Sequence, residues 1–416
     1  MHEFHYKDGI LHCEDIPLTD IAEQYPTPFY LYSYGTVMDH FRKIQDAFRE
    51  VDPLICFSMK SNSNLNICRA LVNAGAGLDI VSGGELYKAL KAGCPPERIV
   101  YASVGKTEEE IKKALVKGIL FFNVESVPEL ITIDTTASRL RKKARVAIRL
   151  NPDVTADTHE YVTTGAKEKK FGIDFKAAED VFDNANKYSH VALKGIHVHI
   201  GSQITDTAPF VDAIKKILDF IDKNNIGIEW LNIGGGLGIV YDREKATTAQ
   251  EFADKIVPLV KDRPFRLILE PGRFIVGNSG ILVCKVLYTK TGSTGKKFAI
   301  VDAGMNDLMR PSLYKAYHEI RPVTERKTNP HRYDVVGPIC ESGDYLALDR
   351  ELQELLPGEY LSVMGAGAYG FSMASNYNSR PRPAELMVIN GEVKVIRAAE
   401  TYRDLIRGEK ILKEFK

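Results

Sequence analysis

Short apolar runs alternate with amphipathic segments of helical period from residue 54 to residue 272. Eight of these runs are predicted strands: 54–60, 77–82, 98–103, 119–125, 145–151, 194–202, 228–236 and 265–272. Between them lie segments such as "TEEEIKKALVKG", which ends on Gly118 as a helix C-cap does. Eight strands that alternate with helices over about 220 residues predict an α/β fold, a TIM-like (β/α)8 barrel. The same alternation also allows an open, doubly wound sheet.

The pattern changes near residue 280. Strand-like runs such as "GILVCKVLYTKTG" and "EVKVIRAA" then follow one another with hardly any long helix between them. Two further strand-like runs, "GILHCEDIPL" and "TPFYLYSYG", precede the first barrel unit. A chain of 416 residues suggests about two domains. We therefore expect a barrel over residues 35–278 and a β-rich domain, a sandwich or barrel, built from residues 1–34 and 279–416.

Composition and charge restrict the partners and the cell compartment that fit the protein. The 55 basic and 55 acidic residues cancel, so the net charge favours neither nucleic acid nor an anionic membrane as a partner. No apolar run reaches the roughly 18 residues that a membrane helix needs, and the polar N-terminus does not resemble a signal peptide. The six cysteines form no CxxC pair, which argues against a zinc site and a disulfide framework. We expect a soluble, cytoplasmic protein without a metal.

Polar residues gather at the ends of the predicted strands. In a barrel of this type the active site lies at the C-terminal ends of the strands. The residues at these ends are Lys60, Asp79, Ser82, Arg149, Asn151, His197, His199, Gly234 to Gly236, Glu270 and Arg273. Each alone has an ordinary explanation, such as a solvated lysine, a hydrogen-bonded histidine or a glycine turn. Their common position at one rim is what indicates a site.

Glycine-containing loops follow the last two predicted strands. "NIGGGLG" spans residues 232–238 and "EPGR" spans residues 270–273. Glycines let backbone N–H groups approach an anion, and barrel enzymes often bind phosphate in these loops. The first loop lacks the GK[ST] ending of a P-loop and the GxGxxG of a dinucleotide fold. The two loops therefore predict a phosphate site for a smaller cofactor, to which Ser202 can add a hydroxyl donor.

A strand-end lysine, a phosphate site, a histidine and a carboxylate together indicate pyridoxal 5'-phosphate. Its aldehyde forms a Schiff base with a lysine, for which Lys60 is the candidate. Glu270 would face the ring nitrogen and keep it protonated, and His199 would lie against the ring. The alternative for "HVH" is a metal pair, because His197 and His199 point to one face of a strand. A third metal ligand has no evident place.

Motifs along the chain resemble those of the diaminopimelate decarboxylase family of fold-type III pyridoxal-phosphate enzymes. They are "FSMKSNSN", "GLDIVSGGE", "GIHVHIGSQI", "LNIGGGLG", "EPGR", "VDAGMNDLMRPSLY", "GPICESGD" and "GAGAYGFSMASNYNSRPRPAE". They run in the family's order from about residue 57 to residue 385. The early motifs are shared with ornithine and arginine decarboxylases, and the last three are the specific ones. No position used below departs from the pattern.

The resemblance implies roles for residues around the cofactor. Lys60 is then the Schiff-base lysine, and His199 is the histidine that stacks on the ring. Asp79 is expected close to the cofactor, with a less certain role. The implied phosphate site consists of Ser202, Gly235, Gly236 and the backbone of Gly272 and Arg273, closed by Tyr369.

The resemblance also implies how a substrate is selected. The implied substrate-binding residues are Arg273, Arg310, Tyr314, Glu341 and Tyr369. Among them, the arginines suit a bidentate contact with the distal carboxylate, and Glu341 would pair with the distal ammonium group. From charge alone, Arg310 and Glu341 would be ordinary surface residues. Cys340 resembles an active-site cysteine delivered from the other subunit, which implies a homodimer with shared sites.

The implied reaction converts meso-2,6-diaminopimelate to L-lysine and carbon dioxide, the last step of lysine biosynthesis. Its catalytic residues are Lys60, His199 and Cys340, with Cys340 or Lys60 returning a proton to Cα. A decarboxylase for ornithine, arginine or carboxynorspermidine should lack the "CES" string that contains Glu341. An alanine racemase places an arginine at the ring nitrogen, where this chain has Glu270. A non-catalytic carrier of the cofactor would be a bare barrel, without residues 280–416.

Overall fold

The computed structural model describes residues 2–154 and 170–415. By their contacts they form two compact units, one of residues 38–275 and one of residues 1–37 together with 276–416. The first unit is a barrel with surrounding helices, and the second is built mainly from sheets.

Eight parallel strands of the described chain close into a barrel in the order β10-β11-β12-β5-β6-β7-β8-β9. Their bounds are β5 (Leu54–Ser58), β6 (Gly77–Ile80), β7 (Ile99–Tyr101), β8 (Phe121–Val124), β9 (Ala144–Arg149), β10 (Val191–His197), β11 (Trp230–Asn232) and β12 (Arg266–Leu269). The barrel closes where β12 pairs with β5, with Leu269 opposite Ile55. This closure confirms the predicted (β/α)8 barrel and excludes the open sheet.

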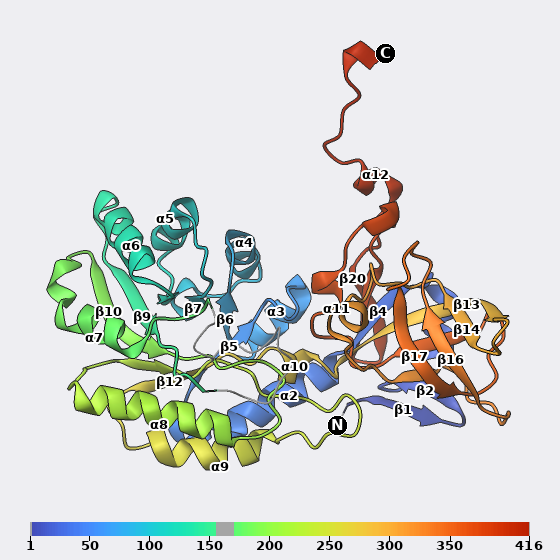
Figure 1. The fold of residues 1–416 in the computed structure, drawn as a ribbon, viewed down its shortest axis with the longest axis horizontal. Coiled ribbons are helices and arrows are strands. Elements are labelled where there is room, and N and C mark those ends of the chain that lie inside the picture. The colour runs from blue at the N-terminus through green and yellow to red at the C-terminus, as the bar shows by residue number, and fades with distance from the viewer. Residues whose placement is uncertain (1, 155–169, 416) are drawn as a thin grey trace. The chain divides into compact units, whose positions relative to one another are not determined.

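A helix lies between each pair of consecutive barrel strands (Figure 1). The bounds are α2 (Tyr34–Ala47) before β5, then α3 (Leu65–Asn73), α4 (Gly83–Lys91), α5 (Glu108–Lys117), α6 (Val127–Arg139), α7 (Phe175–Asp183), α8 (Ala208–Lys223) and α9 (Ala249–Val260), with α10 (Arg273–Val276) after β12. Local chemistry sets their ends. In α5 the side chains of Thr107 and Glu110 each accept a hydrogen bond from the other's backbone N–H, and Gly118 ends the helix at φ 75°.

The barrel strands are buried on both faces, which explains their nearly continuous apolar sequences. Side chains of these strands, with Leu120 just before β8, form a cluster of Cys56, Val100, Leu120, Phe121, Ala147, Trp230 and Ile268. Buried polar residues interrupt these strands near their C-terminal ends, among them Asp79, Asn123 and Asn232. A buried polar side chain requires a hydrogen-bond partner, so these three positions point to the rim where the strands end.

The second unit confirms the predicted β-rich domain. Among its described residues, a nine-stranded sheet has the main order β17-β16-β14-β13-β4-β19-β20, with β15 and β18 off this path, and β1, β2 and β3 form a smaller sheet. In Figure 1 the blue N-terminal strand β4 lies among later strands, because it pairs with both β13 and β19. The bounds are β1 (Phe4–Lys7), β2 (Ile10–Cys13), β3 (Ile16–Pro17), α1 (Leu18–Gln24), β4 (Phe29–Ser33), β13 (Gly280–Thr291), β14 (Lys297–Val301), α11 (Arg310–Tyr314), β15 (Ile320–Pro322), β16 (His331–Val336), β17 (Tyr345–Leu352), β18 (Tyr360–Val363), β19 (Ala384–Ile389), β20 (Glu392–Arg397) and α12 (Tyr402–Leu405).

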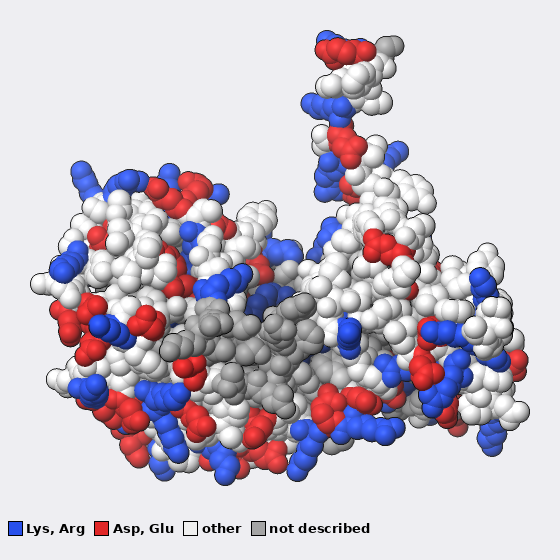
Figure 2. Space-filling model, viewed as in Figure 1, with Lys and Arg blue, Asp and Glu red and all other residues white. Residues whose placement is uncertain are grey.

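Acidic and basic side chains are interspersed among the described residues on the face shown in Figure 2. Within the described ranges, the structure has no helix that combines the length and the apolar character needed to span a membrane.

Candidate active site

Glu270 lies just beyond β12 and is buried among polar side chains from three other strands. Its Oε1 accepts hydrogen bonds from Asn232 Nδ2 at 2.6 Å and from Asn123 Nδ2 at 3.1 Å. Its Oε2 lies 3.2 Å from His197 Nε2. Burial alone would raise the pKa of Glu270, but His197, Asn232 and Lys60 together lower it below its usual range. The site therefore holds an ionised carboxylate out of water.

Lys60 and Asp79 belong to the neighbouring strand ends. Lys60 follows β5 and is half-buried, whereas Asp79 on β6 is fully buried. Ser58 Oγ donates a hydrogen bond of 2.6 Å to Asp79 Oδ2. Burial and the nearby charge of Glu270 raise the pKa of Asp79 well above its usual range, although the Lys60 ammonium opposes this shift. The Lys60 ammonium group thus acts electrostatically on both Asp79 and Glu270, whose environments differ.

The glycine loop after β11 packs its backbone against neighbouring loops. A Cβ atom at Gly235 would lie 2.1 Å from the carbonyl oxygen of Glu270, and one at Gly236 would lie 2.5 Å from that of Gly201. Gly236 also has φ +117°, which favours glycine. The Gly235 N–H donates to His199 Nδ1 at 3.3 Å. Only glycine fits these positions, because any side chain there would meet backbone oxygen atoms of the neighbouring loops.

Arg273 and Ser202 contact one another at the same rim. The buried Arg273 guanidinium donates to Ser202 Oγ at 3.1 Å and to the Tyr241 hydroxyl at 2.7 Å. Gly272 precedes Arg273 and packs closely on the end of β5 and the turn after it, since a Cβ there would lie 3.1 Å from Ser58 Cβ and 3.0 Å from Ser61 Oγ. Tyr241 was not predicted, because an isolated tyrosine in a polar loop carries no sequence signal.

His199 follows β10 and is half-buried. Burial first, then the positive charges of Lys60 and Arg149, lower the pKa of His199 well below its usual range. Its imidazole is therefore neutral at physiological pH. His197 contacts Glu270, and the described residues contain no group of three or more His, Cys, Asp and Glu that could hold a metal ion.

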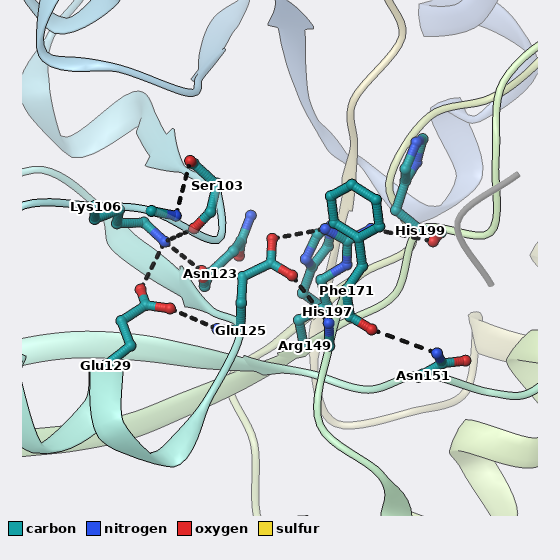
Figure 3. Close-up of polar contacts among 12 residues, drawn as sticks. Ser103, Lys106, Asn123, Glu125, Glu129, Arg149, Asn151, Phe171, His197 and His199 are labelled. Carbon is teal, nitrogen blue, oxygen red and sulfur yellow. Dashed lines mark hydrogen bonds and ion pairs between the residues drawn. The ribbon is translucent and has the colours of Figure 1, made fainter. Parts of the chain in front are cut away.

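Two buried ion pairs lie at the ends of β7, β8 and β9 (Figure 3). Lys106 Nζ is 2.7 Å from Glu129 Oε1 and also donates to the carbonyl oxygen of Asn123 at 2.8 Å. An Arg149 nitrogen is 2.6 Å from Glu125 Oε1. The sequence placed Arg149 at a strand end but gave no indication of its partner or of the lysine pair, since such pairing depends on the closed barrel.

The β-rich unit holds the remaining predicted residues. Arg310 is buried at the start of α11, which ends at the half-buried Tyr314. A guanidinium nitrogen of Arg310 lies 3.5 Å from His318 Nε2. Tyr369 is half-buried with φ 57°, a left-handed conformation that is uncommon for a non-glycine residue. The backbone at Tyr369 therefore has a conformation that the surrounding structure must stabilise.

Cys340 and Glu341 lie in an exposed loop after β16, held by residues 377 and 378. The Tyr377 hydroxyl donates a hydrogen bond to the Glu341 carboxylate. Asn378 Oδ1 accepts a 3.1 Å hydrogen bond from the Cys340 backbone N–H, and Asn378 itself has φ 53°. Neither Tyr377 nor Asn378 was predicted, although both lie within the quoted motif "SNYNSRPRPAE".

The predicted residues thus form separate sets in the two units. The barrel rim brings together Lys60, Asp79, His199, Ser202, Gly235, Gly236, Glu270, Gly272 and Arg273. The β-rich unit contains Arg310, Tyr314, Cys340, Glu341 and Tyr369.

Comparison with known proteins decides the family. The family model of the pyridoxal-dependent decarboxylases, pyridoxal binding domain, matches residues 34–277. A diaminopimelate decarboxylase from Aquifex aeolicus is 49% identical over 401 residues, with 95% of each chain covered. The chain belongs to the diaminopimelate decarboxylase family. A relative of the same name from Pseudomonas aeruginosa is 45% identical, with 99% of this chain and 100% of the relative covered.

Solved structures of diaminopimelate decarboxylases have the same fold. The Helicobacter pylori enzyme complexed with L-lysine has a TM-score of 0.90 at 43% identity, covering 94% of this chain and 98% of that chain. The enzyme from M. jannaschii in co-complex with L-lysine has a TM-score of 0.94 at 37% identity, covering 100% of both chains. Membership of this family makes pyridoxal phosphate the cofactor of the chain.

The residues of the barrel rim fit this cofactor. Asp79 Oδ1 and His197 Nδ1 are both buried, and neither has a hydrogen-bond partner among the described residues. Buried polar atoms of this kind require a partner, which a polar ligand can supply. Gly235 and Gly236 accept no side chain, because a Cβ there would meet backbone carbonyl oxygens. Glu270 is an ionised acceptor for a ring N–H.

Replacing Gly235 by alanine tests the backbone packing of the loop. The added Cβ must displace the Glu270 carbonyl, because the two atoms cannot stay 2.1 Å apart. We expect binding of pyridoxal phosphate to weaken by about tenfold or more, which is ~1.4 kcal/mol or more, in a fluorescence titration of the apo-protein. Gly227→Ala is the control, since no atom lies within 4 Å of a Cβ at that exposed position. Equal affinities for the two variants would contradict this assignment.

Proposed function

We propose that this protein decarboxylates meso-2,6-diaminopimelate to L-lysine and carbon dioxide, as the last step of lysine biosynthesis. The observation that carries the proposal is the buried Glu270, held by two asparagine amides and His197 at the rim of a barrel that belongs to this family. The bound L-lysine in two related structures supports the identity of the product.

The barrel residues hold the cofactor and set its electronic state. Lys60 would bind its aldehyde, and the neutral imidazole of His199 would face its ring. Glu270 would hold a proton on the ring nitrogen, and Asp79 would lie close to the cofactor. When bound, pyridoxal phosphate supplies an electron sink for the electron pair that remains on Cα when carbon dioxide leaves. The phosphate would be held by Ser202, Gly235, Gly236, Gly272 and Arg273, with Tyr369 closing the site.

The second unit supplies most of the substrate contacts. The distal carboxylate is bound by Arg273, Arg310, Tyr314 and Tyr369, for which guanidinium groups provide paired donors. The carboxylate of Glu341 accepts hydrogen bonds from the distal ammonium group. Tyr377 fixes the orientation of this carboxylate. Cys340 or Lys60 returns a proton to Cα. Recognition of both charged groups distinguishes a diamino diacid from ornithine or arginine.

The active site is shared between two copies of the chain. Residues 35–278 form the cofactor domain, and residues 1–34 with 279–416 form the second domain, whose Cys340 and Glu341 complete the site of the other subunit in a homodimer. A cytoplasmic location is supported by the six cysteines, which are all free, since disulfides are rare in that compartment. No nucleic acid or membrane enters this reaction.

A substrate panel tests the proposed reaction. The purified protein with pyridoxal phosphate is offered meso-diaminopimelate, ornithine and arginine, and release of carbon dioxide is recorded. We expect release from diaminopimelate alone, and none from the Lys60→Ala variant, because that variant lacks the amine that binds the aldehyde. Faster release from ornithine or arginine would replace the proposal with one of the related decarboxylases.

Glu270→Gln tests the role of the buried carboxylate. The amide keeps the size of the side chain but cannot hold the ring nitrogen protonated. We expect the cofactor still to bind and kcat to fall by roughly 10²- to 10⁴-fold, the size typical of a positioned proton-transfer group. The exposed Glu229, at the other end of β11 from the rim, provides the control Glu229→Gln. Undiminished turnover in Glu270→Gln would contradict the assignment.

Mixing two inactive variants tests the shared site. In a dimer of Lys60→Ala with Glu341→Ala, one site contains both changes and the other contains neither. Random reassociation should therefore restore roughly a quarter of wild-type sites, an estimate from two-fold symmetry. If each chain supplied all its own residues, every site would keep one change. Tagged mixed dimers that form but stay inactive would refute the sharing of residues while leaving the cofactor chemistry intact.

A further inference from the structure

Arg149 and Glu125 form an ion pair at the barrel rim that none of the roles above uses. Their nearest atoms are 2.6 Å apart, and their side chains are only 6% and 2% exposed. Strand β9 carries a second arginine, Arg145, whose ion pair with Glu229 is 3.5 Å long and exposed at 42% and 50%. The same strand thus provides a buried pair at the rim and an exposed pair at the opposite end.

The buried pair holds two other segments of backbone. A guanidinium nitrogen of Arg149 donates to the carbonyl oxygen of His199 at 3.3 Å, while the second oxygen of Glu125 accepts from the Gly172 N–H at 3.0 Å. The Phe171 ring lies over the guanidinium, 4.9 Å from ring centroid to Cζ. Figure 3 shows Arg149 among Glu125, Phe171 and His199. The pair therefore joins the end of β8 to the loop after β10.

A buried ion pair contributes little net stability, because the loss of hydration offsets most of the attraction between the charges. Two apolar side chains of similar volume, in place of the ion pair, would stabilise the barrel to the same extent. What apolar side chains could not provide is the hydrogen bond to the His199 carbonyl. The imidazole of His199 in turn accepts a hydrogen bond from the Gly235 N–H. A shift of the His199 backbone therefore also moves the glycine loop.

We propose that Arg149, oriented by Glu125, is a positioning residue that fixes His199 against the cofactor. This inference rests on the proposed function only for the statement that His199 faces the cofactor ring. Arg149 takes part in no bond change; it holds the backbone from which the imidazole extends. Loss of this contact should loosen both the ring-facing side chain and the phosphate loop.

The double variant Glu125→Gln with Arg149→Met tests the role without leaving an unpaired buried charge. We expect it to fold, to bind pyridoxal phosphate about 10- to 100-fold more weakly, and to reduce the visible circular dichroism band of the bound cofactor, because small displacements at a reacting centre have effects of this size. Apparent dissociation constants come from titration of each apo-protein. Arg145→Met, on the same strand, should match the wild type in both measurements.

Each outcome decides the proposal. A folded double variant with wild-type cofactor affinity and dichroism would overturn it, as would an equal loss in Arg145→Met. If the double variant does not fold, Arg149→Lys replaces it in the test. Lysine keeps the positive charge but lacks the forked guanidinium that reaches both the Glu125 carboxylate and the His199 carbonyl oxygen. Unchanged cofactor affinity in that variant would overturn the proposal. A wild type that binds the cofactor without decarboxylating any substrate would refute the proposed function alone, since the affinities still report on His199.

Discussion

The pairing of β12 with β5 is the constraint on which the site depends. Leu269 lies opposite Ile55, so the residues that follow these strands, Glu270 and Lys60, reach the same edge of the barrel although they are far apart in the sequence. An open sheet with the same strands would leave one of them at each border. The electrostatic effect of Lys60 on Glu270 therefore exists because the sheet closes on itself.

Within this closed rim, His197 and the hydrogen-bond donors around each carboxyl group decide which of the two carries the charge. Glu270 has two amide donors and a histidine at its oxygens, and its pKa is lowered. Asp79 is also buried, and burial together with the charge of Glu270 raises its pKa, because the one hydroxyl hydrogen bond from Ser58 does not offset them. Two carboxyl groups whose environments separate their pKa values are typical of sites that divide acid and base roles. Lys60 acts on both carboxyl groups, and His197 together with the amide donors favours the charge on Glu270.

The sequence was sufficient for those parts of the fold and the site that depend on local pattern. The apolar runs predicted the eight barrel strands because each run is buried on both faces, and Gly118 predicted the end of α5 because a left-handed residue is needed there. The donors Asn123 and Asn232 were missed, although each is a polar residue inside an otherwise apolar run. Their partner Glu270 is distant in the sequence, and amide pairing leaves no periodic signal. The same reason applies to the strand order of the β-rich unit, where the position of β4 beside β13 and β19 depends on non-local pairing.

The exposed loop of Cys340 and Glu341 shows organisation that a surface loop does not require. An exposed carboxylate usually gains little from being held in one orientation, because water solvates it and side-chain entropy opposes the restraint. Here Tyr377 binds the Glu341 carboxylate, and Asn378 binds the adjacent backbone from a left-handed conformation. Both restraints come from consecutive residues, so the thiol and the carboxylate are presented together. Organisation of exposed reactive groups lowers the entropy cost of their binding a ligand, which is what two groups that complete a neighbouring site would need.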